Sequence, residues 1–239
     1  MVIDPSTHYD IRYWSASKPY RAVLPDGSAE ARFYAGPALW WDGAAAICAT
    51  LIDVLGRSAG SSLLDIGCGA GGFVSGFVAK GIDAYGIDIS TYAVAHAPFA
   101  VKDRVRYGDV LAQESGRGYD SASAFDLVEH IYLADQPKLW RAFESTGAKV
   151  LLLDIGAAHA PEHLWCPEAG LEIPLEREWQ SVSGHVCVLP IEFWLAYART
   201  WGWLPDEPAM EKFEAWRIAT PGYDQLEAWG RKNLLLLRR

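Results

Sequence analysis

The sequence lacks the features of membrane, secreted and nucleic-acid-coating proteins. No apolar run approaches the roughly 20 residues that span a bilayer, and the N-terminus has neither the basic nor the apolar region of a secretory signal. Lys and Arg total 21 against 30 Asp and Glu, and the net charge of −9 opposes phosphate binding. We therefore expect no nucleic acid and no membrane among its partners, and a cytoplasmic location.

Cysteine is also scarce. The four cysteines lie far apart and form no C-x-x-C pair. In a chain without a secretory signal we expect reduced, mostly buried thiols. These thiols are Cys48, Cys68, Cys166 and Cys187.

One group of possible metal ligands has a regular spacing. His159, His163 and Cys166 would share one face of a helix. Pro161 and Pro167 oppose a regular helix there, and no clear fourth ligand accompanies the group. We therefore predict no metal site.

Apolar and aromatic side chains are plentiful. Apolar residues make up 51% of the 239 residues, which is enough to fill the core of one domain. The chain has 11 tryptophans, whose large rings mark deep cores or aromatic-lined sites. Only Trp140 falls within 61–155, so the others belong to the terminal parts of the chain.

Short apolar runs alternate with helical stretches along most of the chain. We expect helices at 41–55, 72–80, 92–96, 136–143, 190–201 and 207–217, and strands at 62–66, 83–88, 104–107, 119–125, 149–154 and 233–238. This alternation predicts an α/β fold with right-handed βαβ units, a parallel sheet and helices on both faces. The continuous apolar strands agree with a sheet that is covered on both sides.

The two ends depart from this alternation. The first 38 residues are rich in Tyr, Pro and Ser and have no clear period, and 157–184 is predicted to be a long loop. We expect a single domain over 1–239. It would comprise an N-terminal cap at 1–40, a ligand-binding core at 41–155, and a long insertion with the last strands at 156–239.

A glycine-rich turn follows the expected strand at 62–66. Gly67, Gly69 and Gly72 have the spacing G-x-G-x-x-G, which lets the backbone turn tightly, approach a ligand and enter a helix. Asp88 stands 21 residues after Gly67, at the end of the next strand, where its carboxylate can accept both hydroxyls of a ribose. These residues suit NAD and an adenosyl ligand equally well.

Two features favour the adenosyl ligand. Asp65 lies two residues before Gly67, where a carboxylate would repel a pyrophosphate but can pair with a ligand ammonium. The segment 119–131 places acidic and histidine side chains at the end of the fourth strand. That position is the carboxyl edge of the sheet, where ligands bind in open α/β folds.

Four motifs in order resemble those of class I S-adenosylmethionine-dependent methyltransferases. They are Leu-Asp-Ile-Gly-Cys-Gly-Ala-Gly at 64–71, Gly-Ile-Asp-Ile-Ser at 86–90, Gly-Asp-Val at 108–110 and Phe-Asp-Leu-Val-Glu-His-Ile at 125–131. The resemblance covers about 41–155 and implies S-adenosylmethionine as the cofactor. It also implies a doubly wound, seven-stranded, mostly parallel sheet whose last strand, at Leu234–Leu237, is antiparallel.

The resemblance further implies which residues hold each part of the cofactor. The methionine part would be held by Asp65, Gly67 and Gly69. The ribose would bind Asp88, and the adenine would lie against Asp109, Val110, Ile89 and Tyr92. We assign seven more residues to the same site: Tyr13, Trp14, Cys68, Gly72, Phe73, Gly108 and Phe125.

The aromatic residues near the N-terminus are candidates for a lid. The rings of Tyr9, Tyr13, Trp14 and Tyr20 would cover the sulfonium by cation–π attraction, with Tyr13 and Trp14 nearest to it. Alternatively, they pack the first helix against the sheet.

Methyl transfer to an oxygen or carbon atom benefits from a general base with a pKa near neutrality. His130, just past the fourth strand, is the first candidate, and His185 in the later loop is the second. Alternatively, Glu129 and His130 form a structural pair, and His185 makes ordinary loop hydrogen bonds. Glu129 and Asp126 either bind a substrate cation or are solvated.

We therefore predict S-adenosylmethionine-dependent methyl transfer to a small-molecule acceptor. The segment 125–131 lacks the Asn/Asp-Pro-Pro-Tyr/Phe motif of the amino-methylating nucleic-acid enzymes of this fold. Two alternatives stay open: an NAD-dependent oxidoreductase, and a non-catalytic partner protein that binds S-adenosylmethionine.

The acceptor itself stays open. The tail segments 174–179, 183–186 and 193–194 resemble a less-characterised microbial branch of the family, for which no substrate class is implied. The terminal tryptophans favour an apolar or ring-shaped acceptor, unless they only pack the terminal elements. The methylated atom (O, N or C) and the oligomeric state are equally open.

Overall fold

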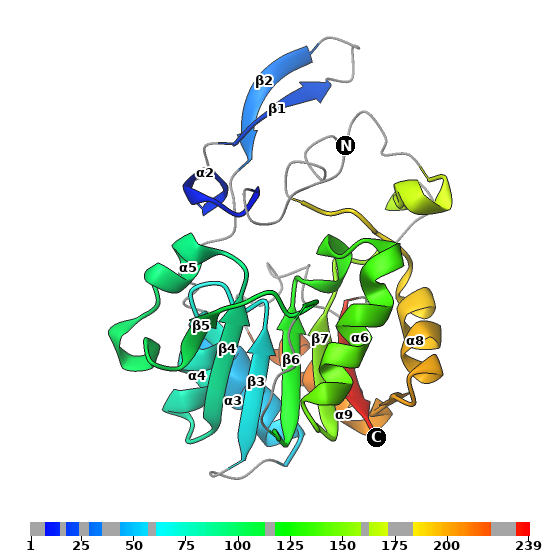
Figure 1. The fold of residues 1–239 in the computed structure, drawn as a ribbon. Coiled ribbons are helices and arrows are strands. Elements are labelled where there is room, and N and C mark those ends of the chain that lie inside the picture. The colour runs from blue at the N-terminus through cyan, green and yellow to red at the C-terminus, as the bar shows by residue number, and fades with distance from the viewer. Residues whose placement is uncertain are drawn as a thin grey trace.

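A seven-stranded sheet forms the centre of the protein in the computed structural model. The model describes residues 8–14, 18–23, 29–34, 44–56, 61–112, 118–158, 163–171, 184–220 and 233–239. The strands of the sheet follow the order β5-β4-β3-β6-β7-β9-β8 (Figure 1). Their bounds are β3 Ser62–Ile66, β4 Asp83–Asp88, β5 Val105–Tyr107, β6 Ser121–Phe125, β7 Val150–Asp154, β8 Leu204–Pro205 and β9 Leu234–Arg238.

Six of these strands run in one direction, and only β9 runs against them. β3 pairs in parallel with both β4 and β6, so the chain reverses its direction of travel across the sheet at β3. β9 lies antiparallel between β7 and β8. The sheet therefore has the predicted doubly wound, mostly parallel form with an antiparallel last strand.

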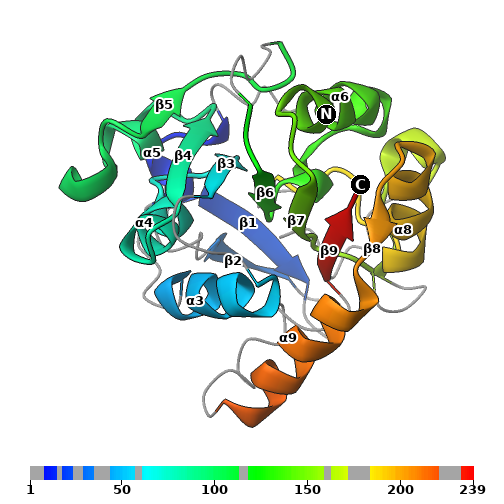
Figure 2. The same cartoon turned by 90° about the horizontal axis from the view of Figure 1, so that it is seen from below.

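Helices cover both faces of the sheet, as Figure 2 shows. One face carries α3 Ala44–Val54, α4 Gly72–Ala79 and α9 Glu207–Ala219, and the other carries α6 Gln136–Ser145 and α8 Ile191–Thr200. The shorter helices are α5 Thr91–Ala95, η1 Phe99–Val101, η2 Val128–His130, η3 Leu133–Asp135 and η5 Pro167–Ala169.

The hydrophobic core fills the space between these layers. Trp140 and Trp194, from α6 and α8, are fully buried against the sheet, and Trp203 is fully buried just before β8. Trp165 is also buried, in a small cluster with Val188. Packing of the terminal elements is thus the observed role of Trp165, Trp194 and Trp203.

The N-terminal part is more regular than its sequence predicts. It contains α2 Ile11–Trp14 and an antiparallel hairpin of β1 Lys18–Val23 and β2 Ala29–Tyr34. Our prediction of an irregular first 38 residues is therefore wrong. A hairpin of two short strands outside the main sheet, with Pro19 in one of them, gives only a weak alternating pattern.

The predicted long loop at 157–184 is described only in part. Isolated bridges join Ala158 to Pro190, Trp165 to Val188 and Cys166 to Leu171, so the described pieces pack back onto the chain before α8. β8 was not predicted, because two residues are too short to carry a period. Among the described residues, no helix has the length and apolarity needed to cross a membrane.

Candidate cofactor and catalytic site

The turn after β3 has a backbone conformation that favours glycine. Gly67 and Gly69 have φ values of 75° and 55°, which L side chains rarely adopt. A Cβ atom on Gly67 would lie 3.0 Å from a methyl group of Leu127, and one on Gly69 would lie 3.1 Å from the Trp14 ring. The turn is therefore in close contact with the segment after β6 and with α2.

Asp88 holds this turn from the end of β4. Its Oδ2 atom accepts a hydrogen bond of 2.7 Å from the Gly69 N–H, and its Oδ1 atom accepts one of 2.7 Å from the Ser90 N–H. Burial raises the pKa of Asp88. Because each carboxylate oxygen has two lone pairs, both oxygens keep capacity for the hydroxyls of a ribose.

Asp65 provides a buried carboxylate next to the turn. Its Oδ1 atom accepts a hydrogen bond of 2.7 Å from the Ser123 hydroxyl, whereas Oδ2 has no hydrogen-bond partner among the described residues. Burial raises the pKa of Asp65 to about 7, and the charge of Asp88 adds to this effect. A buried, half-satisfied carboxylate fits a cationic ligand group, such as the ammonium of a bound amino acid.

Residues predicted to surround an adenine lie at the ends of two adjacent strands. Asp88 pairs with Tyr107 in the register of β4 and β5, and the Gly108 N–H donates to the Asp88 carbonyl at 2.9 Å. The residues that follow these strands, which include the predicted Ile89, Tyr92, Asp109 and Val110, therefore share the carboxyl edge of the sheet. Within this group, the Asp109 carboxylate accepts from the Leu111 N–H, and the Tyr92 ring lies 4.1 Å from the His96 ring.

Three of the predicted cofactor residues, Cys68, Phe73 and Phe125, make packing contacts, whereas the space beside Gly72 is open. The Cys68 side chain points toward β4, where a Cβ on Gly86 would lie 2.5 Å from its sulfur. Phe73 and Phe125 pack ring against ring at 4.2 Å. Gly72 begins α4, and a Cβ there would meet nothing within 4 Å.

The N-terminal segment contacts the turn through Trp14, an arrangement that agrees with both the lid and the packing interpretations. The Trp14 Nε1–H donates to Ser90 Oγ at 3.1 Å, and the Ser90 hydroxyl donates to the Tyr9 carbonyl at 2.6 Å. Tyr13 is almost fully buried, with its ring edge-on to Tyr9 at 4.9 Å and to Trp14 at 5.2 Å. The Trp14 ring therefore lies against Gly69, and Tyr13 packs against Trp14.

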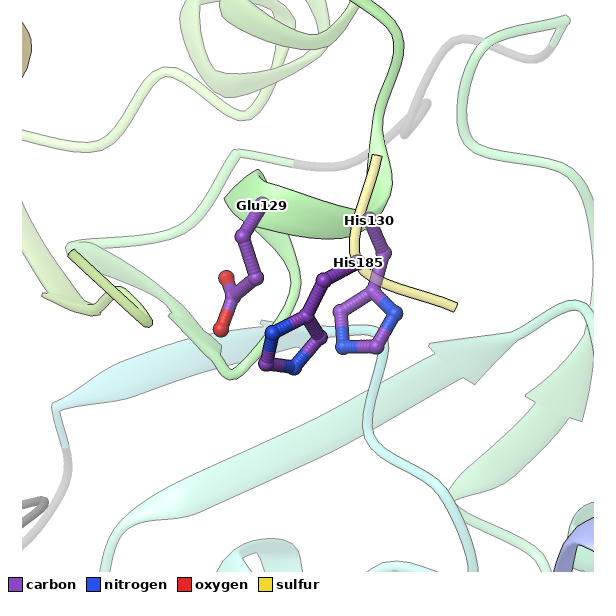
Figure 3. A group of neighbouring side chains, drawn as sticks. All are labelled: Glu129, His130 and His185. Atoms are coloured by element: carbon purple, nitrogen blue, oxygen red, sulfur yellow. The ribbon is translucent and has the colours of Figure 1, made fainter. Parts of the chain in front are cut away.

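Both predicted catalytic histidines meet in one cluster. His130 ends η2, and His185 comes from the segment before α8, yet their rings are edge-to-face with centroids 4.8 Å apart. Nδ1 of His130 is 2.9 Å from the Tyr9 hydroxyl. Figure 3 shows the two imidazoles side by side, with the carboxylate of Glu129 directed toward the His185 ring.

The environment of this cluster keeps its groups uncharged. Burial lowers the pKa of His130, and it lowers the pKa of His185 to about 4. Burial, together with the charge of Asp126, raises the pKa of Glu129 to about 8. Glu129 Oε1 accepts from the Gly156 N–H at 2.7 Å, and its fully buried Oε2 has no hydrogen-bond partner among the described residues. Neutral imidazoles can accept a proton from a substrate, but their lowered pKa makes them weaker bases than the near-neutral base that the sequence analysis favoured.

Glu129, His130 and His185 also offer donor atoms of the kind that metals bind. One such atom from each lies within 4.8 Å of the others. In the sequence analysis, His159, His163 and Cys166 were considered as metal ligands. In the structure Cys166 faces Cys187 instead, with the sulfur atoms 3.1 Å apart, and His159 lies outside the described residues.

Sequence reasoning missed His8 and Ser90, and it expected Tyr9 only in the lid and Asp126 only as a ligand of a substrate cation or a solvated side chain. His8 and Tyr9 both lie against Gly184, where a Cβ would be 2.9 Å from His8 Nε2 and 2.8 Å from the Tyr9 hydroxyl. Ser90 joins the N-terminal segment to the end of β4. Asp126, directly after β6, has a φ of 50° and is the one described non-glycine residue with positive φ. Such strain gathers at functional sites, but no sequence signal marks it.

Comparisons with known proteins agree with this architecture. A family model described as "Methyltransferase domain" matches residues 40–207. Ubiquinone biosynthesis O-methyltransferase of Paracidovorax citrulli is 33% identical over 88 residues, which are 34% of this chain and 37% of the relative. The enzyme of the same name from Acinetobacter baumannii is 31% identical over 84 residues, covering 32% and 35%. The chain thus matches about a third of the length of these curated relatives.

Two solved structures resemble most of this chain. Phospholethanolamine N-methyltransferase 2 of Haemonchus contortus has a TM-score of 0.54 at 19% identity, over 85% of this chain and 54% of the other. The mitomycin 7-O-methyltransferase MmcR has a TM-score of 0.51 at 14% identity, over 81% and 54%. At these identities the likeness shows the fold alone.

Proposed function

Since this chain belongs to the methyltransferase domain family, we propose that it transfers the methyl group of S-adenosylmethionine to a hydroxyl oxygen of a small organic acceptor. The class I methyltransferase fold is confirmed by the family match and the strand order. Oxygen as the accepting atom is supported by the relatives named ubiquinone biosynthesis O-methyltransferase, which match over a third of this chain. The unpartnered oxygen of Asp65 speaks against the NAD alternative, because it would oppose a pyrophosphate.

The described residues fit the cofactor. Asp65 would pair with its ammonium, and Asp88 would accept the hydroxyls of its ribose. Gly67 and Gly69 would let its methionine part approach the backbone, and Trp14 would cover it. When bound, S-adenosylmethionine supplies a methyl group activated by the sulfonium.

The observation that carries the proposal is the contact between the two histidines at the edge of the sheet that holds the glycine turn. Leu127, which touches Gly67, is three residues from His130, so the turn and the cluster adjoin. The protein aligns an acceptor between them, because an in-line displacement depends chiefly on position. In the tautomer whose Nδ1–H donates to the Tyr9 hydroxyl, Nε2 of His130 is the nitrogen that takes the proton of the acceptor hydroxyl.

The test uses the full chain and S-adenosylmethionine labelled with carbon-14 in its methyl group. Phenols and aliphatic alcohols are each paired with the amine of the same skeleton, so only the accepting atom differs within a pair. We expect label on hydroxyl compounds and none on the matched amines. Isothermal titration with S-adenosylhomocysteine and with NADH measures the ligand preference in parallel.

Each other outcome favours a stated alternative. Label on the amines alone would overturn the assignment to oxygen. Binding of S-adenosylhomocysteine without transfer to any compound would support the non-catalytic partner protein. Tight binding of NADH without affinity for S-adenosylhomocysteine would support an oxidoreductase.

A further inference from the structure

Cys166 and Cys187, which are 21 residues apart in sequence, face each other beside the histidine cluster. Trp165 and Val188 form an antiparallel bridge and exchange both backbone hydrogen bonds. The next facing pair in that register is Cys166 and Cys187, at a position without such bonds, where antiparallel backbones are closest, about 4.5 Å between Cα atoms. The Cys166 and Cys187 N–H groups donate elsewhere, to Leu171 and to Glu129.

The side chains of this pair are already close to bonding distance. The two sulfur atoms are 3.1 Å apart, and a disulfide bond is about 2.05 Å long, so a shift of about 1 Å suffices. Both residues are fully buried free thiols. We propose that Cys166 and Cys187 are a redox site, which a small-molecule disulfide such as glutathione disulfide converts reversibly into an intrachain disulfide in the folded protein.

The reaction proceeds by two exchanges. The thiolate of one cysteine attacks a sulfur of glutathione disulfide, forms a mixed disulfide and releases one glutathione thiolate. The second cysteine loses its proton and attacks the protein sulfur of the mixed disulfide, which releases the second glutathione. Two protein thiols lose two electrons, and the two protons end on two glutathione molecules.

Access and acidity make this exchange slow. Neither thiol is exposed, so the segments around 163–171 and 184–189 must separate briefly before an oxidant reaches them. Burial also raises the pKa of Cys187, which lowers the fraction of reactive thiolate. Oxidation therefore takes place on the timescale of local opening rather than of simple collision.

The bond would fasten the segment that carries His185. Cys187 lies two residues after His185 and donates its N–H to the Glu129 carbonyl at 3.0 Å. The bond closes a loop between positions 166 and 187 and restricts the unfolded chain. We expect the melting temperature to rise by about 5–10 °C on oxidation.

Peptide mapping tests the pairing directly. The native protein is equilibrated in glutathione buffers from reducing to oxidising, and free thiols are then alkylated in denaturant. Trypsin separates the two cysteines, because cleavage after Lys149, Arg177 and Arg199 gives the fragments 150–177 and 178–199. We expect these fragments to be joined in oxidised protein and separated by reduction, with Cys48 and Cys68 alkylated throughout.

Variants provide the matched controls. Cys166→Ala and Cys187→Ala should each abolish the joined fragment and the rise in melting temperature. Cys48→Ala, which also removes a buried thiol, should retain both. Fragments that join only after unfolding, a bond to Cys48 or Cys68, or a melting temperature that falls on oxidation would each overturn the proposal.

Discussion

The hydroxyl of Tyr9 lies 2.9 Å from Nδ1 of His130, although 121 residues separate them in sequence. The same tyrosine accepts at its carbonyl from Ser90, which in turn accepts from Trp14. The segment that covers the glycine turn therefore also orients the histidine proposed as the base. In the proposed mechanism, the cover of the cofactor and the placement of the base both depend on Tyr9.

Replacing Tyr9 with Phe removes only the hydroxyl that contacts His130. We expect kcat to fall about tenfold, because an imidazole without its second partner loses a fixed orientation and tautomer. The dissociation constant of S-adenosylhomocysteine should stay within about threefold, since the carbonyl contact to Ser90 is kept. Initial rates with the acceptor from the labelling screen and isothermal titration give the two values. A loss of binding as large as the loss of rate would contradict this separation.

The two histidines should differ from an ordinary histidine in their effect on turnover. His130→Ala should lower kcat by about 100-fold or more, the usual contribution of a general base, and His185→Ala by a smaller factor. His163→Ala serves as the control, because His163 lies in the described segment 163–171, outside the cluster. Rates are compared at saturating cofactor. Full turnover in both His130→Ala and His185→Ala would rule out base catalysis by this pair.

Asp65 should make cofactor binding depend on pH. Its pKa of about 7 in the free protein means that it takes up a proton as the pH falls below 7, and a neutral carboxyl attracts an ammonium weakly. The affinity for S-adenosylhomocysteine should therefore be constant above pH 7.5 and fall below 7, approaching tenfold per pH unit. Isothermal titration between pH 5.5 and 8.5 measures this slope.

Asp65→Asn separates this carboxylate from other titrating groups. Asn keeps an oxygen for the Ser123 hydroxyl but carries no charge. Binding should be weaker than in the wild type at pH 8 and nearly independent of pH down to 6. The exposed Asp103→Asn should retain the wild-type slope. A slope that persists in Asp65→Asn would assign the titration to a different group.

The sequence predicted the features that are determined by residues close together in the chain. Strands β3 and β4 have the predicted bounds, because apolar runs between glycines and turns mark buried strands locally. The positions of the glycine turn and of Asp88 could also be predicted, since both follow from the local pattern of strand, turn and helix. The assignment of these residues to one cofactor site stays a prediction, and the structure adds the packing contacts of Phe73, Phe125 and the Cys68 side chain.

Contacts between distant segments could not be predicted in the same way. Tyr9 meets His130, and His185 meets His130, only because the sheet brings three separate loops to one edge. No spacing or period encodes such pairs. The burial of Glu129 and its bond to Gly156 also arise from this packing, whereas the sequence leaves the same carboxylate open to solvation.

Glu129 should make stability fall as the pH rises. Its pKa of about 8 in the folded protein exceeds the ordinary value of 4.5, so folding favours the protonated form. The resulting stabilisation is complete below pH 4.5 and is lost as the pH rises through 8. Glu129→Gln keeps an acceptor for the Gly156 N–H and cannot ionise. Its melting temperature should match the wild type near pH 5 and exceed it by several degrees at pH 8.5.

A control and a contrary result complete that comparison. Glu211→Gln, at an exposed position of α9, should leave the wild-type pH dependence unchanged. If the melting temperatures of Glu129→Gln and the wild type differed by the same amount at every pH, Glu129 would ionise as freely as a surface residue.

Adding a single methyl group at Gly69 should weaken the binding of S-adenosylhomocysteine. In Gly69→Ala the new Cβ would lie 3.1 Å from the Trp14 ring, at a φ of 55° that alanine adopts at a cost of about 1 kcal/mol. Gly170→Ala has the same kind of backbone strain, at a φ of 75°, with nothing within 4 Å of its Cβ. Both variants should lose a few degrees of melting temperature, but only Gly69→Ala should weaken S-adenosylhomocysteine binding, by about tenfold or more. Equal affinities of the two variants for S-adenosylhomocysteine would show that binding does not depend on the contact between Trp14 and Gly69.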